Sequence, residues 1–307
     1  MLIDVIIPTH KPDKKFKQLL QMLEKQTVSI NRIIIMNTEE KYMDAFCSGY
    51  HFPMDYSKLS VYHLSQKEFD HGKTRNMGAA KSEADIILFM TQDAVPYNEK
   101  MIEALIKPLE DETVACSYAR QLPDKDASPV ERMTREFNYP DKKGIKSKED
   151  IPELGIKTYF CSNVCCAYNA AVFRKLKGFV NHTIFNEDMI YAAKAVENGY
   201  RIAYAADACV IHSHNYTGKQ QFHRNFDLGV SQAEHPEVFE GISSESEGIR
   251  MVKNTLRALK EAGKGREIPP YIYISACKFV GYRMGRNFKR LPKRLILKCT
   301  MSPFYWQ

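Results

Sequence analysis

Short apolar runs alternate with amphipathic segments through the first third of the chain, and this alternation limits the possible folds more than any other feature. Leu2–Ile7 is the first apolar run, and Ile33–Met36 is the second. Between them, Phe16, Leu19 and Leu23 recur at the spacing of one helix face. A strand, a helix and a strand with short connections form the opening of a parallel, right-handed βαβ unit. The sequence therefore predicts an α/β fold.

The same pattern continues beyond the first unit. We expect strands at Leu59–Leu64, Asp85–Met90, Val114–Tyr118, Tyr159–Tyr168 and Tyr200–Ile211, and helices at Lys73–Lys81, Ala170–Leu176, Met189–Asn198 and Ser246–Lys260. The polar stretch Arg120–Lys157, with a short helix at Glu131–Asn138, interrupts this order. Long polar connections in compact domains are typical of lids, so we interpret this stretch as a mobile insertion over a site.

Small polar residues follow three of the expected strands. They are Pro8-Thr9-His10, Asn37-Thr38-Glu39 and Thr91-Gln92-Asp93. In open α/β sheets, ligands bind beyond the carboxyl ends of the strands, so these residues are candidates for a binding site. The sequence has neither GxGxxG after its first strand nor GxxxxGK[ST], which argues against a dinucleotide dehydrogenase and a P-loop NTPase.

Two further stretches carry charge at expected helix starts. Lys73 and Arg75 could face an anion together with free backbone N–H groups, although a solvated helix end is the alternative. Glu187 and Asp188 open another helix, where the helix dipole favours negative charge. Plain N-terminal capping, by Asn186 or Asp188, is the alternative for this pair.

Taken together and in order, these motifs resemble family 2 glycosyltransferases of the GT-A fold, over about residues 2–230. The closest resemblance is to bacterial rhamnosyltransferases, including those that build rhamnan cell-wall polysaccharides, and three stretches carry it: 69–76 (FDHGKTRN), 91–94 (TQDA) and 212–216 (HSHNY). The expected fold is then a mostly parallel sheet flanked by helices, with a helical, basic C-terminal extension.

The resemblance implies a role for each motif. Asp188 would be the general base of an inverting transfer, and Glu187 would position it or touch the acceptor. Asp93 and His212 would hold Mn²⁺ or Mg²⁺, with His214 as the second choice for the histidine ligand. The first acidic position of the metal motif is Thr91 in this chain. We therefore expect weak metal binding, or binding that depends on the phosphates of the donor.

The resemblance also implies a nucleotide-sugar site and its substrates. The donor-binding residues would be Pro8, Thr9, Glu39, Asp70, Lys73, Arg75, Gln92 and Asp93. The implied donor is dTDP-β-L-rhamnose, and the implied acceptor is a lipid-linked oligosaccharide. A transferase that uses a UDP-hexose is one alternative, and a non-catalytic sugar-nucleotide or polysaccharide-binding scaffold is another. The acceptor linkage and the oligomeric state are left open by the sequence.

Charge is unevenly distributed along the chain. Residues 251–307 hold 13 Lys and Arg against Glu261 and Glu267, whereas the rest of the chain is mildly acidic. Within Tyr271–Lys298, cations alternate with aromatic and aliphatic residues, which is typical of a segment that lies on an anionic bilayer. A packed helix with a solvated basic face is the alternative. We find no nucleic-acid-binding motif, so we expect no nucleic-acid partner. The expected division is a transferase domain at 1–240 and a membrane-associating region at 241–307.

Eight cysteines are scattered through apolar contexts without paired CxxC spacing and without a preceding signal peptide. We interpret them as reduced thiols, most of them buried, of a cytoplasmic protein that binds peripherally to the inner face of the plasma membrane. Cys161, Cys165 and Cys166 lie close together in sequence, but their spacing differs from that of a zinc knuckle. We therefore expect no metal at that group.

Overall fold

The computed structural model describes residues 1–51, 58–240 and 244–307, and the side chains of 244–247 are not described. These residues form two compact units. The first comprises Met1–Leu122, Tyr139–His182 and Glu187–His212, and the second comprises Pro123–Asn138, Thr183–Asn186 and Ser213–Gln307. The boundary expected between residues 240 and 241 lies at the edge of the undescribed stretch 241–243.

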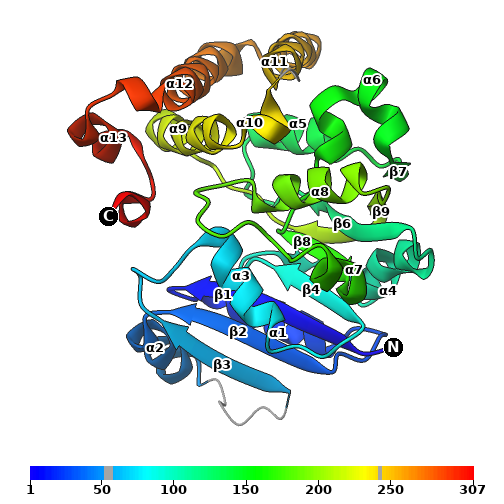
Figure 1. Cartoon of the computed structure of the whole chain (residues 1–307). Coiled ribbons are helices and arrows are strands. Elements are labelled where there is room, and N and C mark those ends of the chain that lie inside the picture. The colour runs from blue at the N-terminus through cyan, green and yellow to red at the C-terminus, as the bar shows by residue number, and fades with distance from the viewer. Residues whose placement is uncertain (52–57, 241–243) are drawn as a thin grey trace. The chain divides into compact units, whose positions relative to one another are not determined.

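The first unit contains a mixed sheet with nine strands among the described residues (Figure 1). The strands are β1 (Ile3–His10), β2 (Arg32–Thr38), β3 (Leu59–Leu64), β4 (Ile86–Met90), β5 (Val95–Pro96), β6 (Val114–Leu122), β7 (Gly144–Lys146), β8 (Cys165–Asn169) and β9 (Arg201–Ile211). Their order is β3-β2-β1-β4-β8-β6-β9-β5, and β7 pairs with β9. The half formed by β3, β2, β1 and β4 is parallel, and β8 is antiparallel to both of its neighbours.

Helices cover this sheet on both faces. The helices of the first unit are α1 (Lys14–Glu24), α2 (Glu40–Tyr50), α3 (His71–Ala79), α4 (Met101–Ile106), α6 (Ile151–Leu154), α7 (Ala170–Lys175) and α8 (Glu187–Glu197). One apolar core joins alternate residues of β1, β2 and β4 to α1, α2 and α4. The opposite face of β4 and β8 packs against aromatic rings of α7 and α8, for example Phe173 and Tyr191 around Tyr168.

Most elements lie where the sequence places them, and the differences have physical reasons. Leu59–Leu64 is a strand with the expected bounds, and the helix expected from Met189 begins two residues earlier. The strand expected at Tyr159–Tyr168 begins only at Cys165, so that prediction is wrong for its first six residues. The apolar character of Tyr159 and Cys161 reflects burial of a 3₁₀ turn and a loop, which periodicity does not distinguish from a strand.

The second unit is helical, and none of its described residues forms a strand. Its helices are α5 (Pro129–Asn138), α9 (Gly218–Glu234), α10 (Pro236–Phe239), α11 (Ser244–Glu261), α12 (Ile268–Arg286) and α13 (Lys293–Cys299). A capping box between Thr217 and Gln220 starts α9. Phe226 and Val230 of α9 form a core with Phe288 and Ile296 from the C-terminal segment. Among the described residues, the structure has no helix long and apolar enough to cross a membrane.

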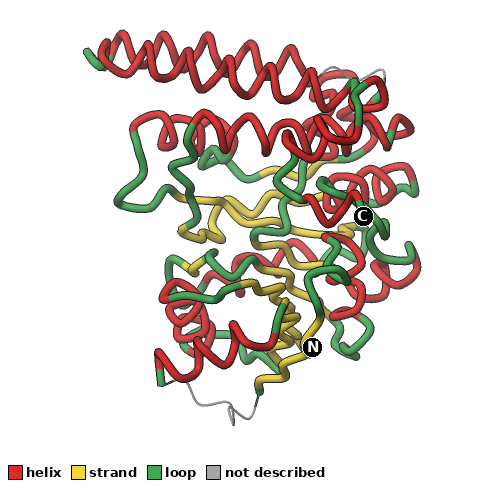
Figure 2. The backbone as a smooth tube through the Cα atoms, turned by 90° about the vertical axis from the view of Figure 1, so that its left-hand side faces the viewer, coloured by secondary structure: helices red, strands yellow, loops and turns green. Residues whose placement is uncertain are grey.

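Glycines let α9 and α12 cross in close contact. The long helices of this unit are drawn as red coils in Figure 2. A Cβ added to Gly281 would lie 2.2 Å from the carbonyl oxygen of Phe222, and one added to Gly285 would lie 2.0 Å from that of Phe226. Backbone atoms cannot move aside as a flexible side chain can. The two glycines therefore allow a backbone-to-backbone packing that any other residue would push apart.

We predict that Gly285→Ala destabilises the protein by about 1–3 kcal/mol, the usual cost of overpacking, because the new methyl group meets the α9 backbone. The matched control is Gly248→Ala in α11, where a Cβ meets nothing within 4 Å. Alanine favours a helix over glycine by about 1 kcal/mol, so the control should be at least as stable as wild type. Thermal unfolding of both variants measures the difference. Equal stability of the two variants would refute the close crossing.

Candidate active site

The ends of β1 and β2 join through polar side chains. Thr9 pairs with Asn37 in the sheet register, and the hydroxyl of Thr9 donates a hydrogen bond of 3.1 Å to Oδ1 of Asn37. Both residues are buried, and Pro8 beside them is half-buried. Nδ2 of Asn37 lies 3.0 Å from Nδ1 of His63 on β3. The polar side chains at the carboxyl ends of these three strands are therefore held in place by contacts with one another.

Two of the predicted donor-binding carboxylates shape the backbone at this edge. Glu39 has a φ of 67° at the start of α2, and its Oε1 accepts a 2.9 Å hydrogen bond from the backbone N–H of Gln66. Asp70 caps α3, because its Oδ1 accepts a 2.7 Å hydrogen bond from the backbone N–H of Lys73. The Lys73 side chain is exposed to solvent.

Arg75 has a different environment from Lys73. Its side chain is 6% exposed, and its Nη1 lies 3.2 Å from Oε1 of Glu187, whose side chain is 7% exposed. The same Nη1 donates to the carbonyl oxygen of His71 at 2.9 Å. This buried ion pair excludes a solvated helix end as the environment of Arg75. The expected contact of Arg75 with a donor phosphate stays a prediction.

A residue that the sequence did not single out organises the carboxylate pair. Asn163 is 2% exposed, and its backbone N–H donates to Oδ2 of Asp188 at 2.9 Å while its Nδ2 donates to Oε1 of Glu187 at 3.0 Å. Its own Oδ1 accepts a 2.8 Å hydrogen bond from the hydroxyl of Tyr168. Oδ1 of Asp188 also accepts from the backbone N–H of Met189. Each oxygen of Asp188 therefore receives one backbone hydrogen bond and keeps a further lone pair.

The two carboxyl groups are held in different electrostatic states. Burial opposes ionisation of Glu187, but the Arg75 guanidinium and other nearby groups outweigh it and lower the pKa of Glu187. Burial and then the charge of Glu187 raise the pKa of Asp188 well above its ordinary value of 3.8. The Asp188 side chain remains partly exposed. The pair thus combines a permanent anion with a carboxyl group whose affinity for a proton is raised, as a general base requires.

Gln92 follows β4 and connects it to the end of β1. Its Oε1 accepts from the backbone N–H of His10 at 2.8 Å, and its Nε2 donates to the carbonyl oxygen of His10 at 3.0 Å. Both ends of the amide are therefore engaged by the backbone. This arrangement makes Gln92 a clamp between two strand ends, and its contact with a donor stays a prediction.

Asp93 and His212 lie together although they are far apart in the sequence. Nε2 of His212 is 3.5 Å from Oδ2 of Asp93, and the imidazole is buried. On the other side of the ring, Nδ1 lies 2.9 Å from Oε1 of Gln121. The Nε2 of Gln121 donates to the hydroxyls of Tyr139 and Ser162, which identifies its Oε1 as the acceptor toward His212. Nδ1 therefore donates to Gln121, and Nε2 is the ring atom that faces Asp93.

His214 belongs to the second unit. Within that unit, its ring stacks on Tyr216 at a centroid distance of 4.9 Å. Its backbone N–H points to a carboxylate oxygen of Glu131 at 3.4 Å. The expectation that His214 is the second choice for a metal ligand stays untested.

Sheet register brings the carboxylate pair to the same edge as the metal motif. Met90 at the end of β4 pairs with Cys165 at the start of β8, and the backbone N–H of Thr91 donates to the carbonyl oxygen of Val164. Asn163 directly precedes Val164 and therefore lies close to the carboxyl end of β4. Since Asn163 binds Glu187 and Asp188, both carboxylates lie at the same edge of the sheet as Thr91.

Comparison with known proteins identifies the family of this chain. The model of the family described as glycosyl transferase family 2 matches residues 4–177. The chain belongs to glycosyltransferase family 2. The chain is 38% identical to the O-antigen chain rhamnosyltransferase RfbN of Salmonella typhimurium, with 100% of this chain and 96% of the relative aligned. It is 37% identical to the O-antigen chain rhamnosyltransferase WbaN of Salmonella anatum, over 98% of this chain and 95% of that protein.

Solved structures of other glycosyltransferases share the fold. The mannosyltransferase PcManGT of Pyrobaculum calidifontis, in complex with GDP-Man and Mn²⁺, has a TM-score of 0.63 at 13% identity and aligns with 94% of this chain and 87% of its own. TarS 1–349 of S. aureus has a TM-score of 0.53 at 16% identity, over 94% of this chain and 91% of its own. The predicted GT-A fold of this family 2 glycosyltransferase is thus confirmed, with a mixed sheet.

The side chains at the metal motif of this glycosyltransferase fit a divalent cation. Asp93 offers a carboxylate oxygen, and the hydrogen bond to Gln121 orients the ring of His212 so that Nε2 lies beside it. A carboxylate and a neutral imidazole whose outer nitrogen is fixed by a second group are a common ligand pair. A cation held there would offset negative charge on the diphosphate of a donor. Solvent or donor phosphates must supply the remaining ligands, since the Thr91 hydroxyl replaces the first carboxylate.

We predict that Glu187→Gln moves the acid limb of the pH profile of kcat/KM to lower pH. In wild type this limb should lie above the ordinary pKa of 3.8, because burial and the charge of Glu187 raise the pKa of Asp188. Removing the Glu187 charge lowers that pKa, so Asp188 ionises at lower pH. Glu83→Gln, at an exposed position, is the matched control and should leave the limb unchanged. A limb that stays in place or moves to higher pH in Glu187→Gln would contradict the assignment.

Proposed function

We propose that this glycosyltransferase transfers L-rhamnose from dTDP-β-L-rhamnose to a lipid-linked saccharide, with inversion at the anomeric carbon. Two considerations support the proposal. The full-length relatives RfbN and WbaN are O-antigen chain rhamnosyltransferases. The chain also pairs an ionised Glu187 with the carboxyl group of Asp188, whose pKa is raised, which is the chemistry that deprotonation of an acceptor hydroxyl needs.

In the proposed reaction, Asp188 takes the proton of the acceptor hydroxyl through the lone pairs that its backbone hydrogen bonds leave open. The acceptor oxygen forms a bond to the anomeric carbon as the bond from that carbon to the diphosphate breaks. Glu187 stays ionised beside Arg75 and keeps Asp188 basic by its charge. Asn163 fixes the direction of both carboxylates, so the base does not reorganise during the transfer.

Donor binding is proposed at the polar edge that the sequence identified. Thr9, Glu39 and Asp70 would contact the base and ribose, and Lys73, Gln92 and Asp93 would lie near the diphosphate. Lys73 is the exposed cation of this group, so it can move to an arriving phosphate without breaking a buried ion pair. Asp93 and His212 would bind Mn²⁺ or Mg²⁺ with the donor.

The first test is transfer by wild type and Asp188→Asn with dTDP-β-L-rhamnose, UDP-glucose and UDP-galactose, each with Mn²⁺ and a lipid-pyrophosphate saccharide. We expect wild type to prefer dTDP-rhamnose and the variant to lose about 100- to 10,000-fold in kcat, the usual contribution of a general base. Donor binding by the variant, measured by thermal shift, should persist. Asp44→Asn, at an exposed carboxylate of α2, is the control.

Three results would overturn parts of this proposal. Preferred transfer from a UDP-hexose would refute the donor. Full activity of Asp188→Asn would refute the base. A wild type that neither transfers nor hydrolyses any of the three donors would favour the scaffold alternative.

We also propose that the second unit binds an anionic bilayer through α12. Ile272, Tyr273, Phe279 and Val280 are 48–61% exposed and recur at positions i, i+1, i+7 and i+8, which is one face of the helix. Exposed Arg283, Lys289 and Arg290 follow this apolar face. Apolar side chains beside cations match the interface of an anionic membrane, where each cation contributes about 1 kcal/mol. This location would bring the enzyme to a lipid-linked acceptor at the cytoplasmic face.

We predict that the full chain co-sediments with phosphatidylglycerol vesicles and not with phosphatidylcholine vesicles, and that Ile272→Ser/Phe279→Ser reduces co-sedimentation. Tyr97→Ser is the matched control, since Tyr97 is an exposed aromatic residue of the first unit. Deletion of 271–307 is a poor test because it removes Phe288 and Ile296 from the core of the second unit. Binding to anionic vesicles that survives the double substitution would refute the α12 surface.

A further inference from the structure

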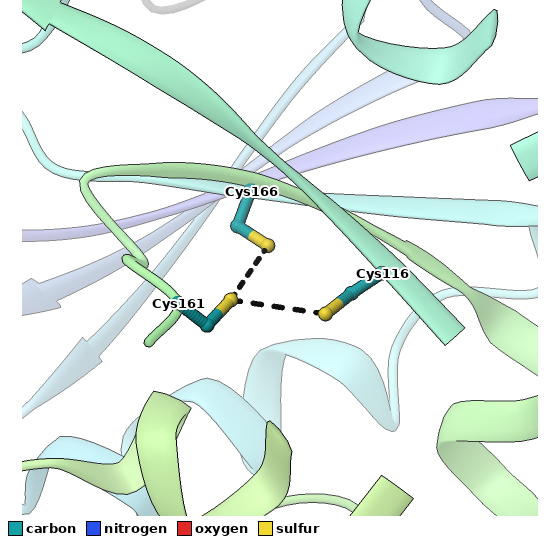
Figure 3. A group of neighbouring side chains, drawn as sticks. All are labelled: Cys116, Cys161 and Cys166. Carbon is teal, nitrogen blue, oxygen red and sulfur yellow. Dashed lines mark hydrogen bonds between the residues drawn. The ribbon is translucent and has the colours of Figure 1, made fainter. Parts of the chain in front are cut away.

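Three cysteine thiols converge in the interior of the first unit (Figure 3). Sγ of Cys161 lies 3.7 Å from Sγ of Cys116 and 3.4 Å from Sγ of Cys166, and all three sulfurs lie within 4.8 Å of one another. The three residues are at most 2% exposed. All eight cysteines of the chain are in described residues and are free thiols. The sulfurs therefore form a close but unbonded triangle.

The triangle is assembled from separate parts of the chain. Cys116 lies on β6 and Cys166 on β8, and sheet register pairs Cys116 with Tyr168 and Tyr118 with Cys166. Because alternate residues of a strand share a face, both cysteines point to the same side of the sheet. Cys161 reaches this side from the loop before β8. Cys165 is not a member, since its Sγ lies 3.7 Å from Met101 on the other face.

A buried cation lies beside the triangle. Lys146 is 9% exposed, and its ammonium donates to the hydroxyl of Tyr118 and to the carbonyl oxygens of Lys157 and Phe160, all of which are neutral. Burial lowers the pKa of Lys146 to about 8, although the nearby thiols act in the opposite direction and raise that pKa. A buried ammonium with neutral acceptors favours an anion close by.

We propose that Cys116, Cys161 and Cys166 bind one thiophilic divalent cation, of which Zn²⁺ is the probe, with the hydroxyl oxygen of Tyr168 as the fourth donor. Zn–S bonds of about 2.3 Å in a tetrahedral site place sulfurs about 3.8 Å apart, close to the spacings of this triangle. The Tyr168 oxygen is 3.9 Å from Sγ of Cys161. Three thiolates, one Zn²⁺ and the Lys146 ammonium sum to zero charge, so the buried group is electrically neutral.

Such a cation would fasten the segment that carries Asn163. Cys161 precedes Asn163 by two residues, and Ser162 between them accepts a hydrogen bond from Gln121, which orients His212. Lys146 holds the carbonyl oxygen of Phe160 on the other side of Cys161. The metal would therefore stabilise the loop from which both Asp188 and Glu187 are positioned. The binding itself does not depend on which sugar the enzyme transfers.

The test is the zinc content of the full chain, prepared without an affinity tag under reducing conditions and measured by mass spectrometry. We expect about one equivalent per chain in wild type. Cys161→Ala and Cys166→Ala should lose most of the zinc. The control Cys165→Ala should retain it, since Cys165 is a buried thiol of β8, like Cys166, but lies on the other face of the sheet. His212→Ala should also retain it, which separates this group from zinc bound at Asp93 and His212.

A second measurement keeps the test independent of the folding of any variant. Co²⁺ exchanged into wild type should give the near-ultraviolet sulfur-to-cobalt charge-transfer band and the visible bands of a tetrahedral thiolate site. Wild type that holds no zinc, is not stabilised by added Zn²⁺ and gives no such spectrum would overturn the proposal. Zinc that is lost in His212→Ala and kept in Cys161→Ala would overturn it as well.

Discussion

The hold of Asn163 on Glu187 and Asp188 is the interaction on which the chemistry of this protein depends. Two neighbouring buried carboxylates repel one another, so the pKa of one of them is raised. Which one it is depends on the other groups around the pair. The Arg75 guanidinium stabilises the charge of Glu187, and the Asn163 side chain donates to the same oxygen. The raised proton affinity therefore falls on Asp188. The Arg75 ion pair and the Asn163 hydrogen bond together favour Asp188 as the proposed base.

The position of Asn163 follows from the mixed sheet. β8 runs antiparallel to β4, so the residues before β8 lie beside the residues after β4. In an all-parallel sheet, the same loop would begin at the opposite edge. The antiparallel insertion thus brings a loop to an edge that otherwise collects only strand exits. It places Asn163, which binds the proposed base, at the edge of the sheet where the residues of the proposed metal site begin.

The sequence predicts the parts of this arrangement that depend on local pattern. Periodicity identifies β1 to β4 and α8, and charge at a helix start identifies Glu187 and Asp188. Asn163 and Gln121 carry no such signal, because a polar residue in or beside an apolar run does not tell which partner it meets across the fold. The same limit applies to the cysteines. Cys161, Cys165 and Cys166 are neighbours in the sequence, and their spacing predicts no metal site. In the structure, strand alternation places Cys165 on the other face of the sheet, and strand pairing places Cys116 beside Cys161 and Cys166 instead.

Several hydrogen bonds hold the 157–163 segment against the strands of the first unit. Lys146 binds its start, the thiols surround Cys161, Gln121 binds Ser162, and Tyr168 binds Asn163. Since these contacts come from three strands, β6, β7 and β8, they hold the backbone of the segment on several sides although most of it is neither a helix nor a strand. A loop with this many buried anchors behaves as part of the core. The proposed base and the proposed histidine ligand are therefore both connected to this one segment, and a shift of the segment would disturb both together.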